Sequence, residues 1–298
     1  MSMSTDSVDP TPWVTVQRRG SIAWLTLNRP GQYNALSEQM LGALHAALDA
    51  LAGDTSVRVV VLGGAGKAFC AGHDLKQMKA NPTQEYYQRL FDNCSRLMMR
   101  IQSLSQPVIA RVHGIATAAG CQLVAACDLA IAAADARFAV SGVNVGLFCS
   151  TPSVALSRNV GRKAAFEMLV TGEFIDAQAA LQRGLVNRCV AAAALDDEIM
   201  KLAAAIAAKP PGVIAAGKAL FYAQLELGLA PAYQVAGQAM ACNMIDAVAQ
   251  EGVSAFIEKR TPNWPFSRGI NSSVCPMISA TKSPDLPLTL TKPIKVSK

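Results

Sequence analysis

The sequence lacks paired cysteines. Its eight cysteines are scattered through 298 residues, no two form a CxxC pair, and several lie inside apolar runs. This pattern argues against a disulfide framework and against a metal site, so we expect no metal and no cofactor of that kind. Reduced, buried thiols are typical of a cytoplasmic protein, and we predict that localisation. The cysteines are residues 70, 94, 121, 127, 149, 189, 242 and 275.

Long apolar runs are lacking too. The first residues, MSMSTDSVDPTPW, show no basic region followed by an apolar stretch, so we expect neither a secretory signal nor a transit peptide. Even the run VAACDLAIAAA is interrupted by Asp128, and no stretch approaches the roughly 18 apolar residues of a membrane span. We therefore predict a soluble protein without a membrane partner.

Charge is scarce and evenly spread. Only 16% of the residues are charged, and the net charge of +6 shows no concentrated basic patch, so no nucleic-acid partner is indicated. Half of the residues are apolar, which is enough to bury a large core. From residue 267 onward the composition changes to Ser, Thr, Pro and Lys. We expect residues 1–12 and 267–298 to be flexible.

What is present is an alternation of strands and helices. β-branched runs predict strands at 13–18, 22–27 and 57–64, and the apolar spacing of 37–52 predicts a helix that starts at Ser37. A second round predicts a strand at 107–114, a helix at 118–128 and one further strand over 128–140. Such alternation is typical of an α/β fold with parallel sheets covered by helices.

The last third is nearly all helical. Helices are predicted over 195–210, 211–228 and 232–260 without intervening strands. We therefore expect an α/β body at 13–190 that contains the site, followed by a helical region at 191–266 that serves as a cap or an oligomerisation arm.

Two glycine-containing turns follow buried strands. They are Gly63–Lys76 and Val112–Gln122, and the second opens a helix whose first-turn amides are free to donate. Neither turn has the glycine spacing of a phosphate loop or of a dinucleotide site. Two amides from two loops can form an oxyanion hole, although both segments are also compatible with ordinary tight turns.

The same segments resemble the enoyl-CoA hydratase/isomerase (crotonase) superfamily, over roughly residues 13–266. KAFCAGHDLK and HGIATAAGCQLVAACDLAIA are similar to the two oxyanion-hole loops of that family. The stretches GLFCSTP and AFIEKRTPNW are shared with one subgroup of it. Four further motifs agree in order: LNRPGQYNALS, VGRKAAFEMLVTGEFIDAQAALQRGLVNRCV, KPPGVIAAGKALFY and EGVSAFIEKRTPNW.

The resemblance implies a crotonase (ClpP-like) spiral of ββα units with a C-terminal helical trimerisation region. It also implies an acyl-CoA thioester as ligand, with coenzyme A as part of the substrate, a role in fatty-acid or acyl-CoA metabolism, and a homotrimer or homohexamer. The oxyanion-hole amides map to His73 and Ala119, with Gly120 beside the second. The residues implied to contact coenzyme A are Ala71, His73, Asp74, Leu75, Lys76, Phe256 and Lys259.

Both glutamates on which hydratases depend are missing. Their positions are occupied by Gln122 and Gly142, and no glutamate occurs between Glu85 and Glu167. A glutamine forms hydrogen bonds but does not titrate, and glycine has no side chain. We therefore predict weak or absent hydration of enoyl-CoA.

His73 is the most attractive replacement as a general acid or base, since its unperturbed pKa is near neutral. Cys149, Asn144 and Ser141 lie in the segment that replaces the second glutamate, and we interpret Cys121 and Cys149 as small buried hydrophobes rather than nucleophiles. Three functions stay open: an enzyme such as a decarboxylase, thioester hydrolase or isomerase, a hydratase with unorthodox residues, and a noncatalytic acyl-CoA-binding protein.

Overall fold

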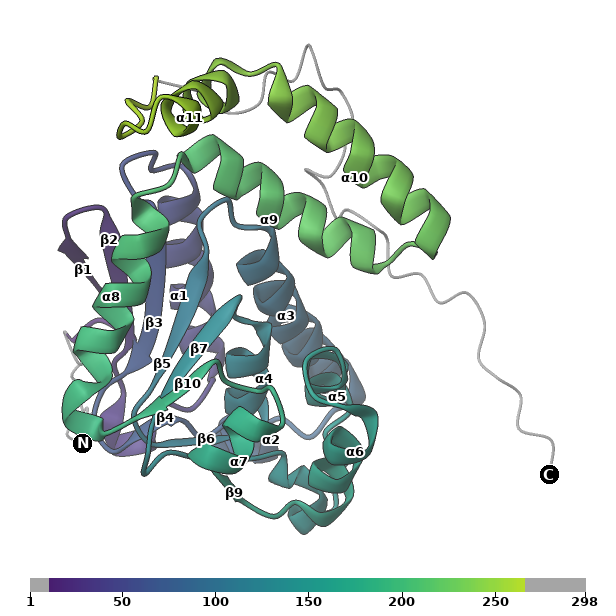
Figure 1. Ribbon diagram of the computed structural model, residues 1–298. Coiled ribbons are helices and arrows are strands. Elements are labelled where there is room, and N and C mark those ends of the chain that lie inside the picture. The colour runs from purple at the N-terminus through teal and green to yellow at the C-terminus, as the bar shows by residue number, and fades with distance from the viewer. Residues whose placement is uncertain (1–10, 266–298) are drawn as a thin grey trace. The chain divides into compact units, whose positions relative to one another are not determined.

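The computed structural model describes residues 11–265, and these form two compact units, one ending at Lys218 and the other starting at Ala219 (Figure 1). The two units are described separately. The flexible segments predicted at 1–12 and 267–298 lie almost wholly outside the described residues. No single described helix is long and apolar enough to cross a membrane; only the bent pair 192–207 and 211–225 passes that test together, by length and composition.

A six-stranded sheet is the centre of unit 1. β1 pairs with β2 in antiparallel register, and all the other neighbouring strands are parallel. Parallel pairing follows from the helical connections between these strands. In spatial order the strands are β1 (Val14–Arg19), β2 (Ile22–Leu27), β3 (Val59–Gly64), β5 (Val108–Val112), β7 (Leu129–Ala133) and β10 (Arg188–Val190).

A second sheet of short strands lies beside the first. β6 pairs in parallel with both β4 and β8, and β8 pairs in antiparallel register with β9. The strands β3, β5 and β7 of the first sheet are thus each followed along the chain by a short strand of the second, as in a ββα repeat. The strands are β4 (Ala68–Cys70), β6 (Ile115–Thr117), β8 (Arg137–Ala139) and β9 (Ile175–Asp176).

The prediction of one strand over 128–140 is wrong. The segment contains β7 and β8, which belong to different sheets. A turn at Ala134 and Asp135 separates them, closed by the bond from the Ala136 amide to the Ala133 carbonyl, 2.9 Å. Alanines recur from β7 through the turn into β8, and the apolar pattern is interrupted only by Asp135 and Arg137.

Both faces of the six-stranded sheet are buried. Along β2, Ala23, Leu25 and Leu27 pack in the larger core with α1, whereas Ile22 and Trp24 pack in a smaller core with α8. This alternation is the period of two expected of a strand. The helices of unit 1 are α1 (Glu38–Ala52), α2 (Leu75–Ala80), α3 (Gln84–Ser103), α4 (Ala119–Ala126), α5 (Ser150–Ser157), α6 (Arg162–Thr171), α7 (Ala177–Gln182) and α8 (Leu195–Ala207).

α8 belongs to the body, so the division between the units falls later than the boundary expected at residue 190. Its buried residues Leu195, Ile199 and Ala203 recur at four and pack on the sheet. The unit boundary lies inside α9 (Pro211–Leu225), after Lys218.

Unit 2 contains the rest of α9, α10 (Leu229–Met244) and α11 (Ala247–Ile257). The single helix predicted over 232–260 is therefore wrong, because it breaks at Ile245. Asp246 caps the new helix by accepting from the Val248 amide at 2.8 Å. An Asx cap competes with continuation of the preceding helix.

Candidate active site

The first loop of the site follows β4 and is held by its backbone. The Ala71 amide donates to the Tyr33 carbonyl at 3.0 Å, and the Gly72 carbonyl accepts from the Leu36 amide at 2.7 Å. Gly72 has a φ of +91°, which L side chains rarely adopt. Within residues 11–265 the next amide, that of His73, has no hydrogen-bond acceptor, so a fixed loop presents a free donor.

Beyond His73 the loop becomes α2. The Asp74 carboxylate caps this helix by accepting from the amides of Lys76 and Gln77 at 2.9 and 3.1 Å. Its hydrogen-bonding capacity is thereby largely committed to the backbone. Leu75 and Lys76 are exposed and remain available to a ligand.

The second loop leads from β6 into α4. Ala118 has φ 50° and ψ −121°, a strained conformation for any residue other than glycine. Its amide donates to the Ala139 carbonyl at 3.0 Å. The amides of Ala119 and Gly120, in the first turn of α4, have no intrahelical acceptor and lie at the positive end of the helix dipole.

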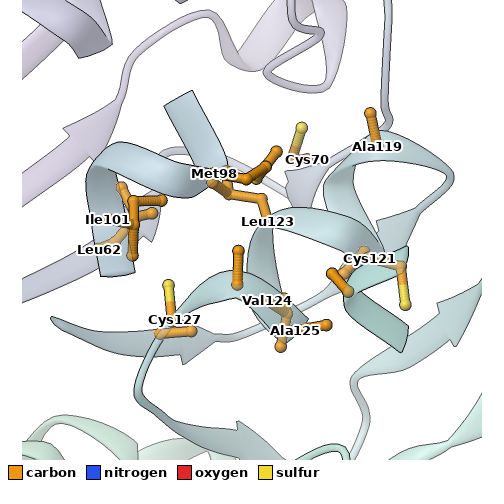
Figure 2. Packing of buried hydrophobic residues seen from close by; sticks show 14 of the residues in the cluster. Leu62, Cys70, Met98, Ile101, Ala119, Cys121, Leu123, Val124, Ala125 and Cys127 are labelled. Atoms are coloured by element: carbon orange, nitrogen blue, oxygen red, sulfur yellow. The ribbon is translucent and has the colours of Figure 1, made fainter. Parts of the chain in front are cut away.

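Tight packing fixes the start of α4. All eight of its residues are buried, and Figure 2 shows its side chains among Leu62, Met98 and Ile101. A Cβ on Gly120 would lie 2.1 Å from the Cys70 carbonyl oxygen, so only glycine allows β4 to approach this closely.

The two loops meet. An ideal Cβ built on Gly72 would lie 3.2 Å from the Ala119 nitrogen and 3.1 Å from the Thr117 carbonyl oxygen. The free amides of His73 and Ala119 therefore come from segments in direct contact. Two such donors can together bind one anionic or partly anionic oxygen.

The His73 imidazole is oriented by two contacts. Nδ1 lies 3.3 Å from the Leu36 carbonyl oxygen, and the ring meets Phe91 edge to face with centroids 5.5 Å apart. Burial lowers the pKa of His73, although the bond to Leu36 opposes this, so the neutral form of the ring is favoured. Nε2 is buried and has no partner among the described residues.

Gln122 lies one turn after Ala119. Its side chain is only 4% exposed, and Oε1 has no hydrogen-bond partner in residues 11–265. A buried carboxamide is usually satisfied, so this one is unusual.

Gly142 lies in the 3-10 helix η2 (Ser141–Val145), and no side chain fits there. An added Cβ would lie 2.4 Å from the Leu147 carbonyl oxygen and 2.7 Å from the Cys149 sulfur. The Gly142 amide donates to that sulfur at 3.3 Å. The thiol thus fills the space into which a carboxylate at 142 would project.

Other residues of this segment have structural contacts. The hydroxyls of Ser141 and Thr117 are 2.8 Å apart and join η2 to the second loop. Asn144 donates to the Gly172 carbonyl at 3.2 Å. Burial raises the pKa of Cys149 and raises that of Cys121 to about 12, so neither thiol ionises readily at neutral pH.

All seven cysteines in the described part of the chain are free, and five of them are buried. No group of three or more His, Cys, Asp or Glu residues there could hold a metal ion.

Phe256 and Lys259 lie outside the unit that contains the site. Both lie in unit 2, at the end of α11, where Phe256 is 85% exposed and Lys259 has a φ of 55°. The site described in unit 1 consists of the two loops, Gln122 and the η2 segment.

Two features of the site escaped sequence analysis. The strain at Ala118 has no sequence signal, because alanine rarely adopts this conformation. Cys149 packs against Gly142, seven residues earlier in the chain, and the sequence does not predict this contact. The only signal in the sequence was the glycine at 142, whose missing side chain leaves space for another group.

The chain belongs to the enoyl-CoA hydratase/isomerase family, whose model matches residues 17–266. It is 44% identical over 264 residues to enoyl-CoA hydratase domain-containing protein 3, mitochondrial, from Xenopus laevis, covering 89% of this chain and 90% of that protein. The family and the subgroup indicated by the sequence are thereby confirmed.

Solved structures agree. An enoyl-CoA hydratase of Mycobacterium smegmatis superposes with a TM-score of 0.84 at 64% identity, covering 85% of this chain and 99% of that one. Human enoyl-CoA hydratase domain-containing protein 3 superposes with a TM-score of 0.82 at 44% identity, covering 85% and 100%. The crotonase fold expected from the sequence is confirmed.

The predicted cytoplasmic localisation is contradicted by the relatives. The Xenopus laevis, rat and human proteins are all named as mitochondrial. Reduced thiols argue against an oxidising compartment, but they do not distinguish one reducing compartment from another.

Proposed function

We propose that this protein binds a coenzyme A thioester and polarises its carbonyl oxygen with the amides of His73 and Ala119. The observation that supports this most strongly is the contact of the two loops, in which Gly72 lies against the Ala119 nitrogen. Donors fixed before the substrate binds need no reorganisation when charge develops on the oxygen. Membership of an acyl-CoA family agrees with this ligand.

Coenzyme A lies along the first loop in this proposal. Ala71 to Lys76 form the wall for the thioester and pantetheine, with the exposed Leu75 and Lys76 in contact and Asp74 shaping the turn as a cap. Phe256 and Lys259, both exposed in unit 2, contact the adenine and phosphates of coenzyme A bound to a neighbouring copy of the chain.

The reaction is not ordinary hydration. Hydration needs a pair of titratable groups to orient water and move its proton, and Gln122 and Gly142 provide none. Decarboxylation, isomerisation or thioester hydrolysis can use an oxyanion hole with a single base. The neutral His73 ring is suited to that role as a base, since its Nδ1 faces the Leu36 carbonyl and leaves Nε2 free to accept a proton.

A noncatalytic acyl-CoA-binding protein is the second candidate. It is favoured by the absence of a carboxylate at positions 122 and 142, and by the raised pKa of the Cys149 thiol. Both candidates require the same thioester site.

Calorimetric titration with acetyl-, crotonyl- and malonyl-CoA, followed by mass spectrometry of the incubated mixtures, tests the proposal. Binding with a changed product mass identifies an enzyme, and binding with every thioester intact identifies a carrier. Absence of binding contradicts the proposal, and crotonyl-CoA hydration at the rates usual for hydratases contradicts the assignment of Gln122 and Gly142.

His73→Ala separates the two roles of this residue, because it keeps the amide and removes the imidazole. Loss of turnover with unchanged acyl-CoA affinity supports the ring as the base. Turnover that survives the substitution leaves only the amide with a role.

A homotrimer or homohexamer is the proposed assembly. Its support is the apolar surface of unit 2, where Leu229, Tyr233 and Met240 are each more than two-thirds exposed. No nucleic acid or membrane is needed for this function.

A further inference from the structure

The side chain of Gln122 has no hydrogen bond to any residue between 11 and 265, although the residue is only 4% exposed. Gln106 provides a contrast within the same body. It is 6% exposed, and its Nε2 donates to the carbonyls of Leu51 and Asp54 at 3.0 and 3.3 Å. The Gln106 carboxamide is thus anchored through its Nε2, although its Oε1, like that of Gln122, has no partner among the described residues. The carboxamide of Gln122 is anchored at neither end.

The position of Gln122 directs it to the thioester site. In an α-helix the Cα–Cβ bond tilts toward the N-terminus, so a side chain covers the turn before its own Cα. For Gln122 that turn contains Ala118 and Ala119, and the Ala119 amide is one of the two proposed oxyanion donors. The carboxamide therefore lies where an acyl group attached to the bound carbonyl would begin.

A carboxamide has both a donor and an acceptor, and a buried one needs partners for both. A saturated or unsaturated hydrocarbon chain offers neither. A ketone or a carboxylate accepts but does not donate, so it leaves Oε1 unpaired. A hydroxyl group donates and accepts at one atom, and it matches both ends of the carboxamide.

We infer that Gln122 selects thioesters whose acyl group carries a hydroxyl, in preference to enoyl or saturated acyl groups. This inference rests on the proposed function, because the thioester must first occupy the two amides. Since the carboxamide does not titrate, it holds the hydroxyl without supplying the proton transfer that dehydration requires. Hydroxyacyl thioesters therefore bind and are not converted to enoyl thioesters.

The test is calorimetric titration of the full chain with butyryl-, 3-hydroxybutyryl- and 4-hydroxybutyryl-CoA. We expect at least one hydroxylated thioester to bind about tenfold more tightly than butyryl-CoA, which is the usual contribution of one buried hydrogen bond. Gln122→Met, which keeps the volume and removes both hydrogen-bonding groups, abolishes this preference. An unfolding midpoint in urea like that of the wild type shows that the variant is folded.

Gln106→Met is the matched control. It lowers the unfolding midpoint because two backbone carbonyls lose their donor, and it leaves the preference for the hydroxylated thioester intact. Equal affinity for the three thioesters in the wild type, or a preference that persists in Gln122→Met, overturns the inference while the proposed function stands. Failure of all three thioesters to bind overturns the proposed function, and the inference with it.

Discussion

Gly142 shows at the scale of one residue how the local fold leaves no room for a carboxylate. The space beside its Cα is filled by the Leu147 carbonyl oxygen and the Cys149 sulfur. A glutamate there must displace the backbone of η2 before it can reach a substrate. The missing carboxylate is therefore part of the local fold and not a single replaceable residue.

We predict that Gly142→Glu destabilises the protein by about 2–3 kcal/mol, the cost of overpacking a filled site. It gains no hydration of crotonyl-CoA, alone or combined with Gln122→Glu. Urea unfolding and the absorbance of the enoyl thioester measure the two effects. Gly161→Glu is the control, since nothing lies within 4 Å of a Cβ at that position; a hydrating double variant would show that the segment rearranges easily.

The histidines give a second prediction at this scale. Burial lowers the pKa of both His73 and His113 in the folded protein. Histidine in the unfolded chain has a pKa of about 6.5. At a pH below this value the unfolded chain binds protons that the two folded rings do not take up. The free energy of unfolding is therefore highest above about pH 6.5 and decreases as the pH falls below that value. The decrease is up to about 1.4 kcal/mol per pH unit for each histidine.

Urea unfolding of the wild type and His73→Gln between about pH 5.5 and pH 7.5 measures this loss, since the interval spans the unfolded pKa of histidine. The variant is expected to lose less stability over the interval than the wild type. An equal loss in both proteins would mean that His73 is protonated in the folded state. His113→Gln serves as a parallel variant, because His113 contacts the Gly66 carbonyl at 2.9 Å and is not one of the residues proposed to contact the thioester.

At the scale of elements, Lys218 ties the first turns of α9 to the body. Its ammonium donates to the carbonyls of Ile101 and Gln106 at 2.9 and 3.0 Å and to the Asp128 carboxylate at 2.6 Å. Asp128 in turn accepts from the Val108 amide. The side chains of the ion pair are only 7% and 12% exposed.

Lys218→Met is expected to destabilise unit 1 by about 3–5 kcal/mol, because it leaves a buried carboxylate without its cation. The unfolding midpoint in urea measures the change. Lys201→Met on the exposed side of α8 should stay within about 0.5 kcal/mol of the wild type, as surface substitutions usually do. A loss of less than 1 kcal/mol in Lys218→Met would mean that other groups satisfy Asp128.

The elements also show what the sequence could predict. The Ser37 cap, the strands β1 to β3 and the amphipathic helices follow directly from caps and periodicity. The division between β7 and β8 did not, because alanines recur from β7 through the turn into β8. The break at Asp246 had a signal, an Asx residue inside an apolar run, which the long periodic pattern obscured.

The site was predictable to a similar degree. Its two loops and the loss of both glutamates are visible in the sequence, whereas the strain at Ala118 and the filling of the 142 position by Cys149 depend on how the chain packs in three dimensions. The direction of the His73 ring, toward Leu36 and Phe91, also depends on the fold.

At the scale of the whole molecule, unit 2 has an apolar stripe that no described residue covers. Leu229, Tyr233, Met240 and Met244 are exposed and lie on one face of α10. A contiguous apolar face of this kind marks an interaction surface. We expect it to be buried between copies of the chain.

Tyr233→Glu combined with Met240→Glu should shift the mass in solution from a trimer or hexamer to a monomer. Light scattering after gel filtration measures this, and Lys201→Met is the control that keeps the wild-type mass. A wild-type protein that is monomeric at all concentrations would contradict the assembly.

The pair of amides is the centre of the account, and infrared spectroscopy of acetyl-CoA labelled with ¹³C at the thioester carbonyl observes it most directly. Hydrogen bonds to the oxygen lower the carbonyl stretching frequency. Ala119→Pro removes one donor at the first helical position, where proline is tolerated, and Gln84→Pro makes the same change at the start of α3.

The account predicts a lowered frequency in the wild type and in Gln84→Pro, and a frequency shifted back toward that of free acetyl-CoA in Ala119→Pro. The same frequency in bound and free acetyl-CoA, or a lowered frequency that Ala119→Pro leaves unchanged, would contradict it.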